Sequence, residues 1–479
     1  MAHSSKSFLL VVLFFLFAMT GCHPTDDSTS VIDSDETNDS GYASCLENPD
    51  FFQNLNLSID ERMATVPNVT WSSIEATTSH VVFGIPDSPS MASLEELVPT
   101  RVHQTFLLGL KQSREYVYQV VSHTDDGDYC SAVQTFSTGR LDESLPELTL
   151  SINDSSQAAG GYTMLSLSNG VNDNVIIIDS DADIVWAHDT QSDSVYRVRL
   201  SLDHKALLYN NIADKSPTIN RISLDGLEIT QTSVFDMHHD FVETENGAYA
   251  TLGVDIQAFS TSEGEQDFCG DTILEVAANG SSREVWNIFD WFEPDPDTNY
   301  HESCSGNHPG AMQWSHSNSL WYEASENAYY LTLRYLDKAC KIDRDTGQLL
   351  WCVGGKDSEF TSIGEDTILK EPHSVLPVDG GLLVFENYDE LADGCSTGAE
   401  ISLDFTSWTA QETWFYGTDT CVLNPIFGNI DPLINGNRML VLGVLGQIDE
   451  TTLDKETVWR VNTPLNYTFA YGNRFESLY

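Results

Sequence analysis

The sequence predicts an all-β protein, namely a six-bladed β-propeller preceded by a small β-sandwich. A pattern of apolar strand, Asp- or Asn-rich turn and apolar strand recurs at irregular intervals of about fifty residues, which is typical of propeller blades. Shorter alternating runs precede these repeats and indicate the sandwich. The chain shows little of the helical periodicity that amphipathic helices produce.

The chain begins with the pattern of a lipoprotein signal peptide over residues 1–22. Lys6 supplies a basic flank, the apolar segment 8–19 is too short for a membrane span, and Met19-Thr20-Gly21-Cys22 fits a lipoprotein cleavage box. We therefore expect Cys22 to carry the lipid. Residues 23–44, rich in Asp, Ser and Thr, should form an acidic disordered tether. The expected location is the bacterial cell envelope, at the outer membrane, with the lipid anchor as the contact with the membrane.

Acidic residues dominate the composition, with 73 Asp and Glu against 22 Lys and Arg and a net charge of −51. Such a surface repels nucleic acid and anionic membranes, and it stays soluble at high salt. A saline habitat and an ordinary acidic secreted protein both account for it. We exclude nucleic acid as a partner, and we expect an anionic substrate to need a local cationic pocket.

Residues 45–142 contain several short alternating runs separated by turn residues, which predict the sandwich. The stretch Leu110-Lys-Gln-Ser-Arg-Glu-Tyr-Val-Tyr118 resembles a fibronectin type III module, where a leucine precedes a tyrosine-bearing strand. The resemblance covers this domain alone and implies the role of a spacer.

The propeller is expected over residues 148–479. Its recurring hairpins and strands are 176–186, 222–229, 274–286, 342–351, 401–414 and 458–462. The run Asp179-Ser-Asp-Ala-Asp183 also invites a calcium-loop interpretation. However, Ile184 stands where such a loop needs glycine, so we interpret the run as a hairpin turn.

The cysteines other than Cys22 form an even set in a chain that is expected to enter an oxidising compartment, so disulfides are favoured over thiols. The absence of any Cys-x-x-Cys pair argues against a zinc site. A turn between Cys340 and Cys352 would place them side by side. Proximity also suggests pairing Cys45 with Cys130, Cys269 with Cys304, and Cys395 with Cys421, although connectivity is not fixed by one sequence.

Three histidines recur at the same place in consecutive repeats, each just before a strand. They are His239, His316 and His373, and Asn429 takes this position in the next repeat. The innermost strand of a blade faces the axis, so these side chains should converge there. Arg334, on the strand expected to pair with that of His316, should lie in the same cavity.

Imidazole is a common metal ligand, and Asp240 could add a carboxylate. A guanidinium beside a dication is unfavourable, whereas its planar fork matches a tetrahedral oxyanion. The combination of imidazoles with Arg334 therefore favours anion chemistry, and we expect neither a metal nor another cofactor.

Four segments together resemble the bacterial arylsulfate sulfotransferases. They are His-His-Asp-Phe at 238–241, Trp-x-His-x-Asn-Ser at 314–319 with its downstream arginine, the hairpin 341–355, and Pro-His-Ser at 372–374. The resemblance covers roughly residues 150–479 and is most specific over 314–355. It implies a six-bladed propeller that moves a sulfuryl group from a phenolic sulfate ester to a phenolic acceptor through a sulfated histidine, without a nucleotide donor.

Carried over by position, the resemblance implies His373 as nucleophile, His239 and His316 as proton-handling and anchoring partners, Arg334 as sulfate clamp, and Asn318 as a residue orienting the sulfuryl oxygens. His238 is a further substrate-binding candidate. Neighbours in a strand point to opposite sides, so only one of His238 and His239 should face the axis. We favour His239, because the residues after it align with those after His373.

Two other functional classes remain open. One is a non-catalytic surface binding or adhesion propeller whose histidines only line a polar channel. The other is a metal-dependent hydrolase, which chelation would inactivate. Incubation with a chromogenic aryl sulfate and a phenol acceptor separates the enzyme from the scaffold.

Overall fold

The structure is a computed structural model that describes residues 45–212, 216–245, 247–262, 264–295, 304, 308–364, 368–388, 394–417 and 421–479. The signal peptide, Cys22 and the tether lie outside this part, so the anchor stays a prediction. Helical structure among the described residues consists of four short 3-10 turns: η1 (Pro49–Phe51), η2 (Glu61–Met63), η3 (Ile288–Asp290) and η4 (Arg334–Leu336). No helix in these ranges has the length and apolarity to cross a membrane.

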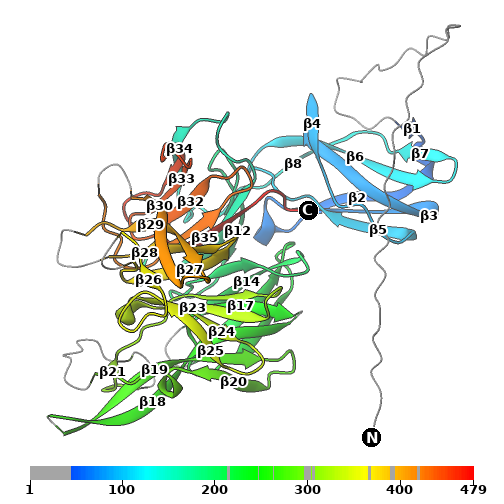
Figure 1. Ribbon diagram of the computed structural model, residues 1–479. Coiled ribbons are helices and arrows are strands. Elements are labelled where there is room, and N and C mark those ends of the chain that lie inside the picture. The colour runs from blue at the N-terminus through cyan, green and yellow to red at the C-terminus, as the bar shows by residue number, and fades with distance from the viewer. Residues whose placement is uncertain are drawn as a thin grey trace, which may run out of the picture. The chain divides into compact units, whose positions relative to one another are not determined.

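Eight strands between residues 46 and 137 form the N-terminal β part of the described chain (Figure 1). They are β1 (Leu46–Glu47), β2 (Phe52–Ile59), β3 (Pro67–Ile85), β4 (Ser88–Ala92), β5 (Thr100–Phe106), β6 (Glu115–Thr124), β7 (Gly127–Cys130) and β8 (Gln134–Ser137). The long β3 pairs with β2, β4, β5 and β6, and its buried residues include Trp71 and Phe83. The Tyr116 hydroxyl accepts a hydrogen bond from the Lys111 backbone N at 2.9 Å, a contact of the kind found in sandwich domains. The fibronectin type III assignment itself stays a prediction.

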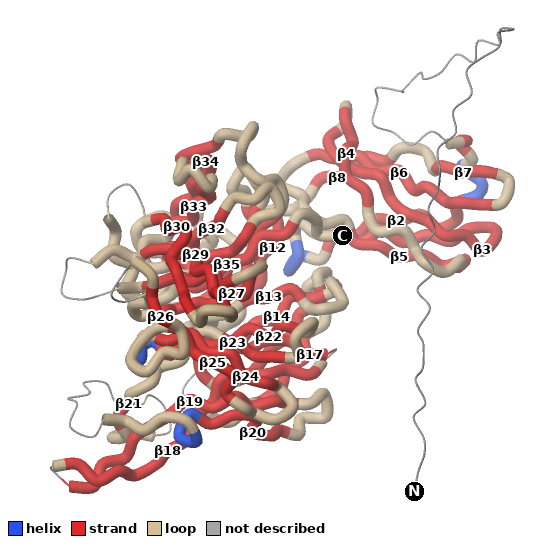
Figure 2. The backbone as a smooth tube through the Cα atoms, in the orientation of Figure 1, coloured by secondary structure: helices blue, strands red, loops and turns tan. Residues whose placement is uncertain are grey.

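The remaining described residues build a six-bladed β-propeller, which confirms the predicted fold class (Figures 1 and 2). Blade 1 contains β35 (Thr468–Phe475), β10 (Tyr162–Ser168), β11 (Asp173–Ile178) and β12 (Ile184–Asp189). Blade 2 contains β13 (Val198–Leu200), β14 (Ala206–Asn211), β15 (Thr218–Ser223) and β16 (Ile229–Ser233). Blade 3 contains β17 (His238–Glu245), β18 (Ala248–Thr261), β19 (Gly264–Val276) and β20 (Ser282–Asn287), with β21 (Met312–Gln313) beside β19. Blade 4 contains β22 (Leu320–Glu323), β23 (Ala328–Leu333), β24 (Lys338–Asp343) and β25 (Leu349–Val353). Blade 5 contains β27 (Pro372–Val378), β28 (Gly381–Glu386), β29 (Thr397–Asp404), β30 (Thr409–Tyr416) and β26 (Thr361–Ser362). Blade 6 contains β31 (Asn429–Pro432), β32 (Arg438–Leu442), β33 (Gln447–Thr451), β34 (Thr457–Asn462) and β9 (Thr149–Asn153).

Both ends of the propeller sequence close the ring. The C-terminal strand β35 pairs with β10 and completes the first blade from the inside, while β9 pairs with β34 on the outside of the sixth blade. The closure leaves the blades without long open edges. It also brings the C-terminal strand to the axis, beside residues from the middle of the chain.

The predicted hairpins are the outer strand pairs of the blades. Segments 176–186, 222–229, 274–286, 342–351 and 401–414 correspond to β11–β12, β15–β16, β19–β20, β24–β25 and β29–β30. The tryptophans that close these hairpins are buried, Trp286 and Trp351 among them, in the apolar clusters between blades. The Asp179–Asp183 run forms the turn between β11 and β12, where the Asp179 carboxylate accepts hydrogen bonds from the backbone N atoms of Asp181 and Asp183.

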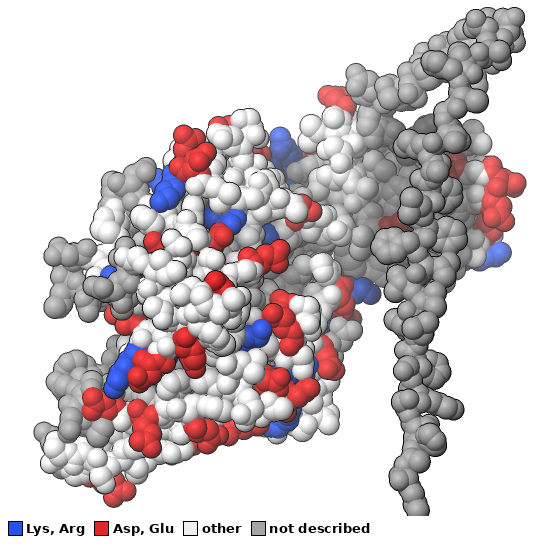
Figure 3. Space-filling view, viewed as in Figure 1, with Lys and Arg blue, Asp and Glu red and all other residues white. Residues whose placement is uncertain are grey.

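Four disulfides are present among the described residues: Cys45–Cys130, Cys269–Cys304, Cys340–Cys352 and Cys395–Cys421. These are the pairs that proximity in the sequence suggested. Acidic side chains are spread over the face drawn in Figure 3, and basic ones are fewer there. The acidic balance is therefore a general surface property and not a single patch on that face.

Candidate active site

Three histidines from consecutive blades lie together at the axis. The rings of His239 and His316 are 5.0 Å apart between centroids. His373 interacts electrostatically with both of them. His239 belongs to β17 and His373 to β27, while His316 precedes β22 by a few residues. The structure thus brings together the histidines that the repeat register singled out.

The backbone at two of these histidines is unusual. His239 has a φ of 48° and His316 a φ of 55°, in the left-handed region that non-glycine residues seldom adopt. The pairing of β17 with β18 shifts register between His238 and Phe241. Strained conformations of this kind persist where surrounding structure imposes them, and they cluster at functional sites.

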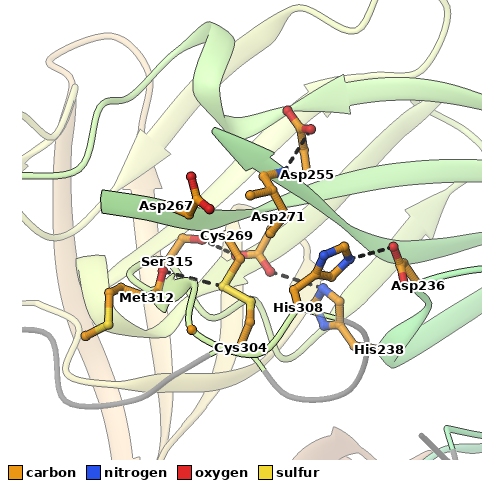
Figure 4. Close-up of a disulfide and its surroundings, with 12 residues drawn as sticks. Asp236, His238, Asp255, Asp267, Cys269, Asp271, Cys304, His308, Met312 and Ser315 are labelled. Carbon is orange, nitrogen blue, oxygen red and sulfur yellow. Dashed lines mark hydrogen bonds and ion pairs between the residues drawn. A yellow bond between two sulfur atoms is a disulfide. The ribbon is translucent and has the colours of Figure 1, made fainter. Parts of the chain in front are cut away.

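The left-handed backbone at His239 corrects one expectation. Regular strand alternation would place His238 and His239 on opposite sides, but their Nδ1 atoms lie only 2.9 Å apart. His238 Nε2 contacts the Gly253 carbonyl at 3.1 Å and the Asp271 carboxylate at 3.2 Å. Figure 4 shows Asp271 pointing toward His238 from β19, close to the Cys269–Cys304 disulfide. Both histidines therefore belong to one hydrogen-bonded group, and the ring of His239 also contacts that of His316.

His373 is held in a defined tautomer. Its Nδ1 lies 3.2 Å from the Gly428 carbonyl oxygen and 3.1 Å from the Tyr471 hydroxyl. A carbonyl oxygen only accepts, so Nδ1 carries the proton and Nε2 keeps its lone pair. The Tyr471 hydroxyl in turn donates to the backbone carbonyl of Asn318 at 3.3 Å. Gly428 has a φ of 101°, and a Cβ there would lie 2.5 Å from the Phe385 ring.

The three imidazoles are neutral. Burial lowers the pKa of His239, His316 and His373 well below 6.5. Mutual repulsion among the rings and the positive charge of Arg334 lower these pKa values further. Neutral imidazoles retain the lone pairs that nucleophilic attack and proton acceptance require.

Arg334 is held next to His316 by a backbone hydrogen bond and by an ion pair with Glu371. It begins the turn η4 and not, as the sequence suggested, the end of the strand, because β23 ends at Leu333. Its backbone N donates to the His316 carbonyl at 3.1 Å. Its Nε and Nη2 donate to one oxygen of Glu371 at 3.1 and 2.7 Å. A guanidinium has five N–H donors, so this ion pair leaves donors for a ligand anion.

Asn318 carries unused hydrogen-bonding capacity. Its side chain is fully buried, and within the described residues neither its Oδ1 nor its Nδ2 has a hydrogen-bond partner. Nearly all buried polar groups in proteins are bonded, so such an amide calls for an explanation. Its backbone links to Tyr471 and thereby to His373. The amide thus keeps a donor and an acceptor unused in the interior of the protein near the histidines.

Two further arginines near the axis, Arg197 and Arg199, share the carboxylate of Asp240. Arg197 forms two hydrogen bonds to the Asp240 carboxylate at 2.9 and 2.7 Å, and Arg199 contacts the same carboxylate. Asp240 also accepts from the Leu320 backbone N, so it joins blades 2, 3 and 4. The adjoining hollow measures about 20 Å³, too small for an aryl sulfate. The Asp240 carboxylate, considered as a metal ligand from the sequence, is thus engaged by two arginines and a backbone N.

Asn429, at the register position of the histidines in the sixth blade, also has a structural role. Its side-chain amide donates to the Gly472 carbonyl at 2.8 Å and accepts from the Gly472 backbone N at 3.0 Å. It therefore acts as an additional backbone-like link between the sixth blade and the closing strand β35.

Several residues at the site were not predicted from the sequence. Asp271 and Glu371 are the acidic partners of His238 and Arg334, and Tyr471 contacts His373. Two aromatic rings, Tyr196 and Phe427, lie 5.1 Å apart, and Tyr196 also contacts His239. An acidic residue within a buried strand, as at Asp271, is the one local signal that could have indicated such a partner.

The axis of the propeller holds histidines with lowered pKa values, a partly exposed arginine and an amide without a hydrogen-bond partner among the described residues, a set of groups that suits a small anion. The chain belongs to the arylsulfotransferase (ASST) family, whose sequence model matches residues 148–465. This confirms the family resemblance and supports aryl sulfotransferase activity in general.

Several solved structures are similar to the chain at low identity and with TM-scores below 0.5. A protein of unknown function from Bacteroides caccae is 16% identical, with a TM-score of 0.39, over 67% of this chain and 100% of that one. The periplasmic gluconolactonase of Pseudomonas aeruginosa is 14% identical, with a TM-score of 0.39, over 65% and 99%. TolB from Acinetobacter baumannii is 12% identical, with a TM-score of 0.39, over 75% and 81%. No curated protein matches the chain.

Proposed function

We propose that this protein transfers a sulfuryl group from a phenolic sulfate ester to a phenolic acceptor through a sulfated His373, without a nucleotide donor. The observation that carries the proposal is the fixed tautomer of His373, whose Nδ1 is bonded to Gly428 and whose Nε2 lone pair remains available. The family assignment supplies the substrate class.

A neutral imidazole suits this nucleophilic role. A sulfate ester carries a negative charge, so an anionic nucleophile would be repelled, whereas the uncharged Nε2 is not. Burial lowers the pKa of His373 and keeps this nitrogen unprotonated. In the first half-reaction the S–O bond to the phenolate breaks as an S–N bond forms at Nε2. In the second half-reaction the acceptor oxygen attacks sulfur and the S–N bond breaks.

Arg334 and Asn318 would hold the transferring group. The guanidinium offers N–H donors beyond those engaged by Glu371, and the amide of Asn318 offers both a donor and an acceptor. In comparable oxyanion sites, a preorganised donor of this kind typically lowers the activation barrier by about 3 to 4 kcal/mol. The buried position of Asn318 adds to the interaction, because water does not compete for it.

His239 and His316 would handle protons and anchor the ester. The departing phenolate must gain a proton, and the acceptor phenol must lose one. A positioned imidazole typically contributes about a hundred- to ten-thousand-fold to such a step. His239 stands next to the aromatic ring of Tyr196, which offers a surface for the aryl group.

The enzyme is tested with purified protein, a chromogenic aryl sulfate and a phenol acceptor. We expect release of the chromogenic phenol, appearance of the sulfated acceptor, and a sulfuryl adduct on the peptide that contains His373 after donor treatment alone. A binding or adhesion propeller would release no phenol. A metal-dependent hydrolase would use water as acceptor and would be inactivated by a chelator.

We also propose that the enzyme is held at the bacterial outer membrane by lipid on Cys22. The cleavage-box pattern supports this location. Cys22→Ala should move the protein from the membrane fraction to the soluble fraction of the native host. Unchanged membrane association would contradict the anchor.

A further inference from the structure

Behind His239 lies a hydrogen-bonded chain that the transfer mechanism does not yet use. The Asp271 carboxylate is 3.2 Å from His238 Nε2, and His238 Nδ1 is 2.9 Å from His239 Nδ1. Asp271 is itself fixed, because its other oxygen accepts from the Ser315 hydroxyl and from the Ser317 backbone N. Figure 4 shows Asp271 between Ser315 and His238.

The partners of His238 determine where protons can reside. Its Nε2 contacts the Gly253 carbonyl, which only accepts, so Nε2 carries a proton in every state. The close contact between the two Nδ1 atoms must then hold one proton. When this proton is on His239, the Nε2 of His239 is bare and acts as a base. When it is on His238, a neutral His239 carries its own proton on Nε2 and acts as an acid.

The surrounding charges decide which ring becomes the cation. Burial, His316, His238 and Arg334 all lower the pKa of His239 and oppose a positive charge there. The carboxylate of Asp271 adjoins His238 and compensates a positive charge on that ring. A proton placed on His238 would therefore lie beside the Asp271 carboxylate, one residue away from the reacting anion.

We propose that Asp271 and His238 form a proton relay that lets His239 change between acid and base without becoming a cation. This proposal rests on the proposed sulfuryl transfer. As the S–O bond breaks, His239 Nε2–H protonates the departing phenolate, and His238 Nδ1–H passes its proton to His239 Nδ1. During the second half-reaction the acceptor O–H gives its proton to His239 Nε2, and His239 Nδ1–H returns a proton to His238. The proton count balances over one turnover, and His238 is a positioning residue that contacts no substrate in this step.

The relay is tested by the dependence on the leaving group in Asp271→Asn and His238→Asn. Single-turnover phenol release is measured with 4-nitrophenyl sulfate, whose phenolate leaves without protonation, and with phenyl sulfate, whose phenolate needs a proton. We expect release from phenyl sulfate to fall about a hundred-fold or more, and release from 4-nitrophenyl sulfate to stay near that of the wild type. Asp271→Asn keeps an acceptor oxygen for Ser315 and Ser317, so it preserves the local fold better than His238→Asn.

A matched control is Asp236→Asn, since Asp236 pairs with His308 at 2.8 Å in another His–Asp contact near the same disulfide (Figure 4). This variant should release phenol at the wild-type rate with both donors. Equal losses with both donors in Asp271→Asn, or no loss with either, would overturn the relay while leaving the transferase intact. Absence of phenol release from the wild type with both donors would instead refute the proposed function itself.

Discussion

Replacing Asn318 with leucine should both raise the free energy of unfolding and lower kcat for the proposed transfer. The amide is buried, and neither of its polar atoms has a hydrogen-bond partner among the described residues. An unsatisfied buried polar group costs about 1 to 3 kcal/mol, so removing it should raise the free energy of unfolding by about that amount. Leucine has the same branching at Cγ, which limits changes in packing. If the amide orients the sulfuryl group, kcat should fall about a hundred- to a thousand-fold.

Asn424→Leu is the matched control for stability. Asn424 is equally buried, but its Nδ2 donates to the carbonyls of Ile426 and Phe427, and its Oδ1 accepts from the Val444 backbone N. Removing this satisfied amide should therefore destabilise the fold by at least about 1 to 3 kcal/mol. Thermal and denaturant unfolding of both variants, with the disulfides oxidised, gives the comparison. A loss of stability in Asn318→Leu together with unchanged transfer would refute the reasoning.

Four further outcomes are expected. His373→Ala should abolish transfer with an unchanged melting temperature, and substantial residual transfer would assign the nucleophile elsewhere. Arg334→Ala should lower kcat/KM by the equivalent of about 3 to 4 kcal/mol in steady-state assays, and a change below tenfold would remove it from the clamp. Gly428→Ala should lower both stability and kcat, because the new Cβ meets the Phe385 ring and moves the carbonyl that holds His373; unaltered kinetics would show that the tautomer is fixed otherwise. Protonation of His373 removes the lone pair of Nε2, and the lowered pKa of His373 shifts this loss to lower pH. The acidic limb of the pH profile of kcat/KM should therefore have its midpoint well below 6.5. A midpoint at 6.5 or above would contradict a buried neutral nucleophile.

The repeat pattern was sufficient to predict the fold, because each blade has a recognisable local sequence pattern. The Asp-rich turns and the closing tryptophans mark the outer hairpins, and both signals act within about a dozen residues, as between Ile342 and Trp351. The register of the inner strands was likewise visible, since His239 and His373 stand at matching places before apolar runs. Short separations also made the disulfide Cys340–Cys352 predictable.

The partners of the site residues were not predictable, because they come from other blades or depend on local backbone geometry. Glu371, directly before the inner strand of the fifth blade, pairs with Arg334 of the adjacent fourth blade, and Tyr471 contacts His373 only after the ring closes. The relation of His238 to His239 depends on a positive φ that no strand pattern anticipates. Periodicity thus placed the histidines, whereas the groups that set their protonation required the tertiary structure.

The closing strand β35 has a consequence for the order in which activity can arise. It follows every other strand of the propeller along the chain, yet it carries the Tyr471 hydroxyl that contacts His373. A nascent fragment that ends before β35 therefore holds all three histidines and Arg334 but lacks one of the groups that orient His373. The full set of contacts around His373 should therefore form only when the last strand docks.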